Sequence, residues 1–412
     1  MNNVYDIKSA KKLNFILPLE CNMKEDILRG SSVLIVVHLH YLDTIDFYME
    51  YINNIPDEIK LIITASNDCV KKRLQEIKVS KKKKYKIVEK RNRGRDISSF
   101  LVACRKDILK YDYICFLHDK KEKGDLQKSD TLKWIRSLWE NMIGSKAYIN
   151  NVLYTLHKNP RLGLLVPPFP ISENFSFSLY TDAWQKDFIV TKNLANDMNL
   201  QCELDSSKQP ITLGTVFWAK VAALKKLFEI EWKYEDFPEE PLNDDGTISH
   251  AVERILAYVA QDAGFETGWV MTDRYAAEEF EYTQIVLRKA FQRLNESLDI
   301  RNLSELENYE ERIEKLLRFI NMHECLYIYG AGIRGKRVLS LLKSLQKEPN
   351  AFLVSDKSSD LKNIDGIPVY SLSDIELDKE CGIIVGVGKK YQDEILFNIR
   401  KKNQQFRNIY VD

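Results

Sequence analysis

Short apolar runs alternate with longer amphipathic stretches over most of the chain, from Ser31 onward. The runs rich in Val, Ile and Leu predict strands at Val33–His38, Leu61–Ala65, Lys86–Glu89, Tyr113–Leu117 and Leu162–Val166. Between the last two, apolar residues recur at helical spacing from Thr131 to Leu156. Strands that alternate with helices predict an α/β fold built around a mostly parallel sheet.

The segment 284–322 has the pattern of a linker helix. Ser304, followed three residues later by Glu307, is a capping-box signature for its start. Apolar residues then repeat at helical spacing, at Leu306, Tyr309, Ile313, Leu316 and Ile320. This stripe predicts a helix that packs on one or both of its neighbours.

A second α/β unit is predicted after residue 322. Its strands lie at Leu326–Tyr329, Ala351–Val354 and Ile383–Val387, and a helix between the first two ends near Leu345. The pattern is typical of a small Rossmann-like domain. The predicted organisation is an N-terminal arm (1–30), an α/β domain (31–283), a helical linker (284–322) and a small C-terminal domain (323–412).

Composition and charge narrow the class of protein. Of the 412 residues, 44% are hydrophobic and 29% are charged, as in soluble globular proteins. A net charge of +1 gives no overall field that would select nucleic acid. No apolar run approaches the ~20 residues that span a bilayer, and the N-terminus lacks the apolar core of a signal peptide. Seven cysteines without a CxxC pair favour reduced thiols in the cytoplasm.

Two polar clusters lie on either side of one predicted helix and strand. The first precedes the helical stretch 97–108 and reads Asn92-Arg93-Gly94-Arg95-Asp96. The second follows the next strand and reads His118-Asp119-Lys120-Lys121. Open parallel sheets bind ligands at the carboxyl ends of their strands. The alternative is a pair of solvated loops.

The two clusters have the chemistry of a diphosphate site. Gly94 lets the backbone approach a ligand, and Arg93 and Arg95 can neutralise phosphate. Asp119, at a strand end, can hold a divalent cation that bridges a diphosphate. Lys120 or Lys121 can instead stabilise a leaving diphosphate as a point charge.

The order of four motifs resembles the rhamnan synthesis protein F family. The two clusters are followed by Gly214-Thr215-Val216-Phe217-Trp218 and by His250-Ala-Val-Glu253-Arg254. That family is similar to GT-A glycosyltransferases, whose nucleotide-binding half has a Rossmann-like sheet. The resemblance implies a GT-A-like glycosyltransferase of polysaccharide or lipopolysaccharide synthesis. Its donor would be a nucleoside-diphosphate sugar, dTDP-L-rhamnose, and its acceptor a glycan or lipid-linked glycan.

The resemblance also assigns site residues. The donor would lie against His38, His40, Tyr41, Thr64, Ser66, Arg93, Gly94, Arg95, Asp96, His118, Asp119, Lys120 and Lys121. The sugar or acceptor would lie against Gly214, Thr215, Phe217, Trp218 and His250. GT-A proteins carry Asp-x-Asp where this chain has His118-Asp119-Lys120. Asp119 is therefore the candidate ligand for Mg²⁺ or Mn²⁺, and no tightly bound metal is expected.

An inverting transfer needs a base for the acceptor hydroxyl. Glu253 is the first candidate, because it matches the acid of the family's last motif. The alternative for Glu253 is a helix-terminal salt bridge. Asp244 and Asp245 are the reserve candidates, although residues before Gly246 also suit a turn.

Two other functions stay open. Four histidines with Asp119 have the residue types of a zinc or iron site and would make the protein a metal-dependent hydrolase, namely His38, His40, His118 and His250. The lysine run 81–84 suits either a solvated connection or anionic lipid headgroups. In the second case the chain could be a non-catalytic scaffold of a glycan-synthesis complex at the inner face of the membrane.

The C-terminal domain carries a glycine fingerprint. Gly330, Gly332 and Gly335 follow a strand and open a helix, and Asp356 ends the next strand. Glycine amides at a helix N-terminus can hold a phosphate. The domain is short for a dinucleotide fold, so docking or homo-oligomerisation is the expected role and nucleotide binding the alternative.

Overall fold

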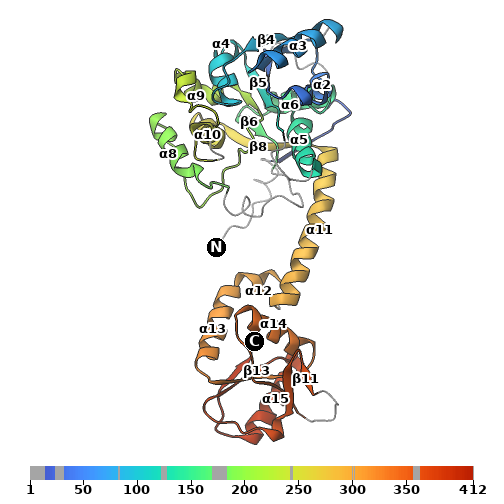
Figure 1. Cartoon of the computed structure of the whole chain (residues 1–412), viewed down its shortest axis with the longest axis vertical. Helices are drawn as coiled ribbons and strands as arrows, with labels where there is room; N and C mark the ends of the chain where they lie inside the picture. Colours follow the sequence, from blue (N-terminus) through green and yellow to red (C-terminus); the bar gives the residue numbers. More distant parts are fainter. Residues whose placement is uncertain are drawn as a thin grey trace. The chain divides into compact units, whose positions relative to one another are not determined.

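The computed structural model describes residues 14–23, 32–81, 84–121, 128–168, 183–241, 245–298, 300, 302–355 and 362–411. The chain divides into two compact units, Met1–Tyr282 and Thr283–Asp412. The division falls within helix α11 (Asp273–Leu298). Both units are α/β, so the predicted fold class is confirmed (Figure 1).

The described residues of the N-terminal unit form one eight-stranded sheet with the order β1-β8-β6-β7-β5-β2-β3-β4. Within this sheet β7 runs antiparallel to its neighbours β5 and β6, and the other pairs are parallel. The strands are β1 (Asn14–Leu17), β2 (Val33–Leu39), β3 (Lys60–Ala65), β4 (Lys86–Glu89), β5 (Tyr113–His118), β6 (Leu162–Val166), β7 (Phe217–Lys220) and β8 (Glu266–Thr272). The prediction of a mostly parallel sheet is confirmed.

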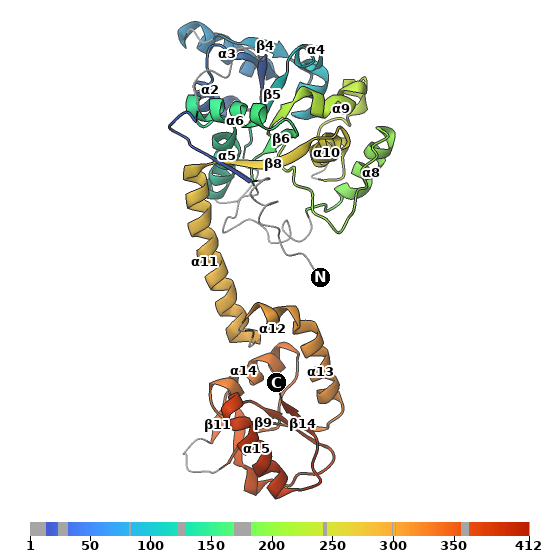
Figure 2. The same ribbon diagram turned by 180° about the vertical axis from the view of Figure 1, so that it is seen from behind.

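Helices cover both faces of this sheet (Figures 1 and 2). One face carries α2 (Ile45–Ile52), α3 (Asp68–Lys81), α5 (Lys128–Ile143) and α6 (Lys146–Lys158). The other carries the π-turn η2 (Ser99–Ala103), α4 (Arg105–Ile108), α8 (Asp187–Asp197), α9 (Lys225–Glu229) and α10 (Ile248–Asp262). Strand β2 is buried along its whole length because its side chains alternate between the two cores: Val33, Ile35 and Val37 face one, and Leu34 and Val36 the other.

The described part of the C-terminal unit has a six-stranded sheet with the order β11-β12-β10-β9-β13-β14. Its strands are β9 (Cys325–Tyr329), β10 (Ala351–Val354), β11 (Asn363–Ile364), β12 (Ile367–Ser371), β13 (Cys381–Val385) and β14 (Ile409–Val411). The helices are α12 (Leu303–Glu307), α13 (Tyr309–Asn321), α14 (Ile333–Ser344) and α15 (Lys389–Lys402). Short 3-10 helices complete the two units: η1 (Leu42–Thr44), η3 (Val221–Leu224), η4 (Tyr234–Asp236) and η5 (Leu372–Asp374).

Four local predictions need correction. The stretch 131–156 is two helices, because α5 ends before Gly144 and α6 begins after Ser145. The Ser145 hydroxyl caps α6 by accepting a hydrogen bond from the Tyr148 amide. The stretch 97–108 is a π-turn followed by the short α4. The capping box at Ser304 is wrong: Asn302 caps α12, and its side chain accepts from the Glu305 amide. Part of the predicted N-terminal arm is strand β1, which pairs with β8.

Candidate functional site

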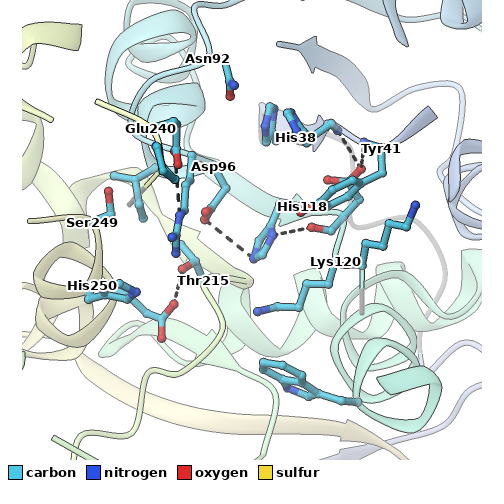
Figure 3. A pocket seen from close by; sticks show the side chains of 18 residues that line it. His38, Tyr41, Asn92, Asp96, His118, Lys120, Thr215, Glu240, Ser249 and His250 are labelled. Carbon is cyan, nitrogen blue, oxygen red and sulfur yellow. Dashed lines mark hydrogen bonds and ion pairs between the residues drawn. The ribbon is translucent and has the colours of Figure 1, made fainter. Parts of the chain in front are cut away.

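A cavity of about 840 Å³ opens at the carboxyl ends of β2 and β5 (Figure 3). Because β2 and β5 are parallel neighbours with His38 opposite His118, the loops that follow them emerge side by side. The cavity is lined by residues from these loops, the 92–97 turn, and the segment that leads into α10. They are His38, His40, Tyr41, Asn92, Arg95, Asp96, Ile97, His118, Asp119, Lys120, Lys121, Trp134, Thr215, Glu240, Pro241, Ser249, His250 and Glu253.

The loop after β5 is held from several sides. The Asp119 carboxylate accepts hydrogen bonds from the backbone amides of His40 and Tyr41, at 2.7 and 2.8 Å, and so ties this loop to the one after β2. The Tyr48 hydroxyl lies 2.8 Å from both the amide and the carbonyl oxygen of Lys120. The Trp139 indole donates to the His118 carbonyl at 3.1 Å. The polar cluster 118–121 is therefore a fixed part of the cavity wall.

Burial changes the acidity of Asp119. Desolvation of the carboxylate, which is only 5% exposed, raises its pKa to about 6, and the amides of Tyr41 and His40 offset part of the rise. Asp119 therefore changes charge close to neutral pH.

The His118 ring has carbonyl oxygens at both nitrogens. Nδ1 lies 2.9 Å from the Asp119 carbonyl oxygen and Nε2 lies 2.8 Å from that of Gly214. Carbonyl oxygens only accept, so both contacts are hydrogen bonds only in the imidazolium form. Nε2 is also 3.8 Å from an Asp96 carboxylate oxygen. In this geometry neither ring nitrogen offers a lone pair to a metal ion.

Three basic side chains, Arg95, Lys120 and Lys121, also line the cavity. Arg95 lies 4.0 Å from the Glu240 carboxylate, and Lys121 pairs with Asp43. The Lys120 ammonium lies over the Trp134 ring, 4.0 Å from its centroid. Burial lowers the pKa of Lys120, and the Glu253 and Asp96 carboxylates oppose that change.

Glu253 lies on α10 and lines the same cavity. One carboxylate oxygen accepts a 2.6 Å hydrogen bond from the Thr215 hydroxyl, and the other contacts the Arg254 guanidinium. Burial is the largest single influence and raises the pKa of Glu253. Arg254, Lys120, Thr215 and the Gly214 amide together outweigh it and lower the pKa to about 2. Glu253 is therefore an anion at any physiological pH.

Two residues of the cavity wall have left-handed backbone conformations. Arg95 has φ of 43° and follows Gly94 (74°), and Thr215 has φ of 49° and follows Gly214 (90°). A β-branched residue such as Thr rarely adopts this conformation, which persists only where its surroundings enforce it. Such positions concentrate at functional sites.

Two polar atoms of the cavity wall are buried without a hydrogen-bond partner in the described structure. They are a carboxylate oxygen of Asp96 and the hydroxyl of Ser249. A buried polar group without a partner is costly unless a ligand or solvent satisfies it. The pair therefore points to a polar ligand in this part of the cavity, where Figure 3 shows Asp96 directed at the centre.

The structure gathers most predicted site residues, but not all. Thr64 and Ser66 lie behind the wall, where their hydroxyls contact Nδ1 of His38 and of His40 at 2.9 and 2.6 Å. They contact the two rings and are not among the residues that line the cavity, so their contact with a nucleotide stays a prediction. Burial, with help from Lys90, lowers the pKa of both histidines.

The prediction for Arg93 and Gly94 also needs correction. Arg93 points away from the cavity, where its guanidinium donates to the carbonyl oxygens of Phe237 and Glu235. A side chain on Gly94 would place its Cβ 2.6 Å from the Phe237 ring, so this glycine serves close packing. Of the two arginines in the cluster, only Arg95 lines the cavity.

The aromatic pair Phe217 and Trp218 is fully buried on β7, one residue in each core. The Trp218 indole donates to the Met142 carbonyl. The prediction that these rings contact a sugar is therefore wrong. Gly214 takes part through its backbone, whose carbonyl oxygen contacts His118 and whose amide contacts Glu253.

Only one of the two reserve bases lies in the described part of the chain. Asp245 is not among the residues that line the cavity, and Asp244 lies outside the described residues.

Sequence reasoning missed Trp134, Glu240 and Ser249, and also the lining residues Ile97 and Pro241. It placed Asn92 in the first polar cluster without assigning it a role. Trp134 had the spacing of a helix core residue, and Glu240 and Ser249 belong to no motif. The buried Asp187, whose carboxylate lies 3.3 Å from the Arg254 guanidinium, had no sequence signal either.

The cavity wall does not fit a divalent cation. Among the described residues, no group of three or more His, Cys, Asp and Glu side chains could hold a metal ion. One oxygen of Asp119 is occupied by two amides, and the cations Arg95 and Lys120 line the same cavity. The proposed four-histidine hydrolase site is therefore not formed in this structure, and the donor set suits an anion better than a cation.

In the C-terminal unit, the predicted strand, glycine turn and helix are present at β9 and α14. A Cβ on Gly335 would lie 1.8 Å from the Gly330 carbonyl oxygen, so the turn requires glycine there. Asp356 lies outside the described residues. Nucleotide binding by this unit stays a prediction.

Within the described residues, no helix combines the length and the apolar character that crossing a bilayer requires.

Most of the N-terminal unit matches a known protein family. The family model of rhamnan synthesis protein F matches residues 1–265, which is more than half of the chain. The chain is also 25% identical over 271 residues to "Uncharacterized protein WxcX" from two strains of Xanthomonas campestris pv. campestris, B100 and ATCC 33913. The match covers 62% of this chain and 36% of WxcX, so the chain spans about a third of the length of these relatives. The chain belongs to the rhamnan synthesis protein F family.

Proposed function

We propose that the N-terminal unit is a glycosyltransferase that moves a sugar from a nucleoside-diphosphate donor to a glycan acceptor. The observation that carries this proposal is one cavity, at the carboxyl ends of parallel strands, that holds both basic and acidic side chains. Arg95, Lys120 and Lys121 supply its positive charge. The same wall holds Ser249, His250 and Glu253, which offer hydroxyl, imidazole and carboxylate groups.

The basic side chains suit a diphosphate. Arg95 and Lys120 would neutralise its oxygens with charge-assisted hydrogen bonds, beside a His118 ring that two carbonyl groups hold in place. His38, His40 and Tyr41, at the end of β2, would lie beside the nucleoside. Since the wall does not fit a divalent cation, we propose that these cations stabilise the leaving diphosphate without one.

The Glu253 carboxylate suits an acceptor hydroxyl. In the proposed reaction this oxygen attacks the anomeric carbon, the bond from that carbon to the diphosphate oxygen breaks, and the configuration inverts. Glu253 is the proposed acceptor of the hydroxyl proton. With a pKa of about 2 it is a weak base toward a neutral alcohol. We therefore propose that it first accepts a hydrogen bond and receives the proton late, once bond formation has made the hydroxyl acidic.

The family's name favours rhamnan synthesis, and dTDP-L-rhamnose is accordingly the proposed donor. The proposed acceptor is a growing glycan, free or lipid-linked, at the cytoplasmic face of the membrane. The remaining alternative is a scaffold that binds no donor.

A titration panel tests the proposal. The full chain is mixed with UDP, GDP, dTDP and their sugar conjugates, and binding is followed by calorimetry and thermal shift. We expect one nucleoside diphosphate to bind and its sugar conjugate to be slowly hydrolysed or transferred. Absence of binding across the panel would favour the scaffold. Binding without any turnover, with or without glycan acceptor, would contradict the catalytic part of the proposal.

A further inference from the structure

Helix α11 carries a stripe of five apolar residues and one polar residue, all exposed except the half-buried Leu294. They follow one another at alternating intervals of three and four residues and are Ala277, Phe280, Gln284, Leu287, Phe291 and Leu294. Phe280 is 68% exposed, Leu287 40% and Phe291 48%. Aligned exposed rings and leucines are unfavourable in water unless another surface covers them.

The spacing identifies the kind of surface that would cover the stripe. An apolar repeat of 3.5 residues keeps one seam of a helix facing a second helix, as in a coiled coil. The sequence breaks the seam once with a polar residue, the exposed Gln284. A single polar side chain in such a seam fixes the register of pairing.

We propose that two copies of this chain associate through α11, with the two helices antiparallel. In the register that this seam allows, Phe280 packs near Phe291 of the partner subunit, and Gln284 lies beside Leu287 of the partner subunit. The two-fold axis then passes between Gln284 and Leu287, and every seam residue meets a counterpart.

The charges beside the seam favour the antiparallel arrangement. Glu281 and Arg288 are both exposed and occupy equivalent positions on the same flank, seven residues apart. In the antiparallel register Glu281 lies beside Arg288 of the partner subunit, and the reverse pair forms across the axis. The opposite flank carries Thr283 and Ala290 at the corresponding positions. A parallel pair would place Glu281 and Arg288 against this uncharged flank and gain no ion pair.

The test is the oligomeric state of the full chain, measured by light scattering after size exclusion and by sedimentation over a range of protein concentrations. We expect a species of twice the 48.1 kDa chain mass. Leu287→Asp and Phe291→Asp should each yield monomer. Val79→Asp changes an 80% exposed apolar residue on α3 and should leave the dimer intact.

Charge exchange tests the direction of pairing. Glu281→Arg or Arg288→Glu alone should weaken the dimer by roughly tenfold, since like charges then meet twice. The double variant should restore it. Arg293→Glu makes the same change of charge on the same helix, away from the seam, and should have little effect. Circular dichroism confirms that each variant is folded.

Several results would overturn the proposal. A wild-type chain that stays monomeric at all concentrations excludes self-association through α11. A dimer that survives both aspartate substitutions must use another surface. Failure of the charge exchange to restore the dimer would rule out the antiparallel register.

Discussion

The hydroxyl of Thr215 donates a 2.6 Å hydrogen bond to the carboxylate of Glu253. Thr215 precedes β7 and Glu253 lies on α10, so this contact joins two motifs that are 38 residues apart. Its donor has a left-handed backbone, and its acceptor is held as an anion by Arg254 and Lys120. The pair therefore fixes a negative charge in the wall of the cavity that Arg95, Lys120 and Lys121 also line.

Replacement of Glu253 by Gln should lower transfer by ~10²- to 10⁴-fold, the usual range for loss of a proton acceptor. Nucleoside diphosphate affinity should change by no more than about threefold, since Glu253 faces the acceptor in the proposed arrangement. Glu229→Gln is the matched control, because Glu229 also pairs with a neighbouring cation but lies on the exposed side of α9. Steady-state transfer and calorimetry on both variants provide the measurement. Near-normal turnover of the Glu253 variant would leave the residue a purely structural role.

Asp119→Asn should stabilise the protein at neutral pH. The pKa of Asp119 rises on folding from 3.8 to about 6, so the folded state binds the proton more tightly than the unfolded state. Below pH ~4 the Asp119 carboxyl is protonated in the folded state, so no buried charge lowers the stability there. The cost grows as pH rises from ~4 to ~6 and is complete above that, at up to about 3 kcal/mol. Asn removes it and keeps an oxygen for the amides of His40 and Tyr41.

Urea denaturation of wild type and Asp119→Asn at pH 4.5 and pH 7.5 measures this effect. The stability difference should be small at the lower pH and favour the variant at the higher pH. Transfer should fall in the same variant, as expected where a residue is retained for function at a cost in stability. A variant that is less stable at both pH values would refute the pH dependence given for Asp119.

Lys120→Met should weaken nucleoside diphosphate binding by about 10- to 100-fold, the scale of one charge-assisted hydrogen bond. Met retains the length and apolar contact of the side chain over Trp134. Arg93→Met is the control, because the Arg93 guanidinium is engaged by the carbonyl groups of Glu235 and Phe237, away from the cavity. Equal losses in the two variants would argue that both basic residues act at long range and that Lys120 has no direct contact.

Chelation should leave donor binding intact. The cavity wall offers Asp119, already occupied by two amides, and several cations instead of a cage of carboxylates. Calorimetric affinity for the nucleoside diphosphate should therefore change by less than about threefold between EDTA and excess Mg²⁺ or Mn²⁺. A tenfold or greater dependence on either metal would show that the bound donor recruits a cation that the wall alone does not hold.

The amino-acid sequence by itself predicted five of the eight described strands of the first sheet and three of the six of the second. These strands have a local signal, because a strand buried on both faces is a nearly continuous apolar run, and parallel strands end on the same side of a sheet. The strand pattern is therefore enough to predict that the residues that end β2 and follow β5, among them His38 and Asp119, lie close together.

Only the tertiary structure decided which side chains of each motif face the cavity. Arg93 and Arg95 are two residues apart, yet a left-handed turn directs one to the 235–237 backbone and the other to the cavity wall. Phe217 and Trp218 belong to a motif but point into the two cores, whereas Trp134 looks like a core residue and lines the cavity. The direction of a side chain depends on backbone torsions and on packing against segments distant in sequence, and neither leaves a periodic signal in the sequence.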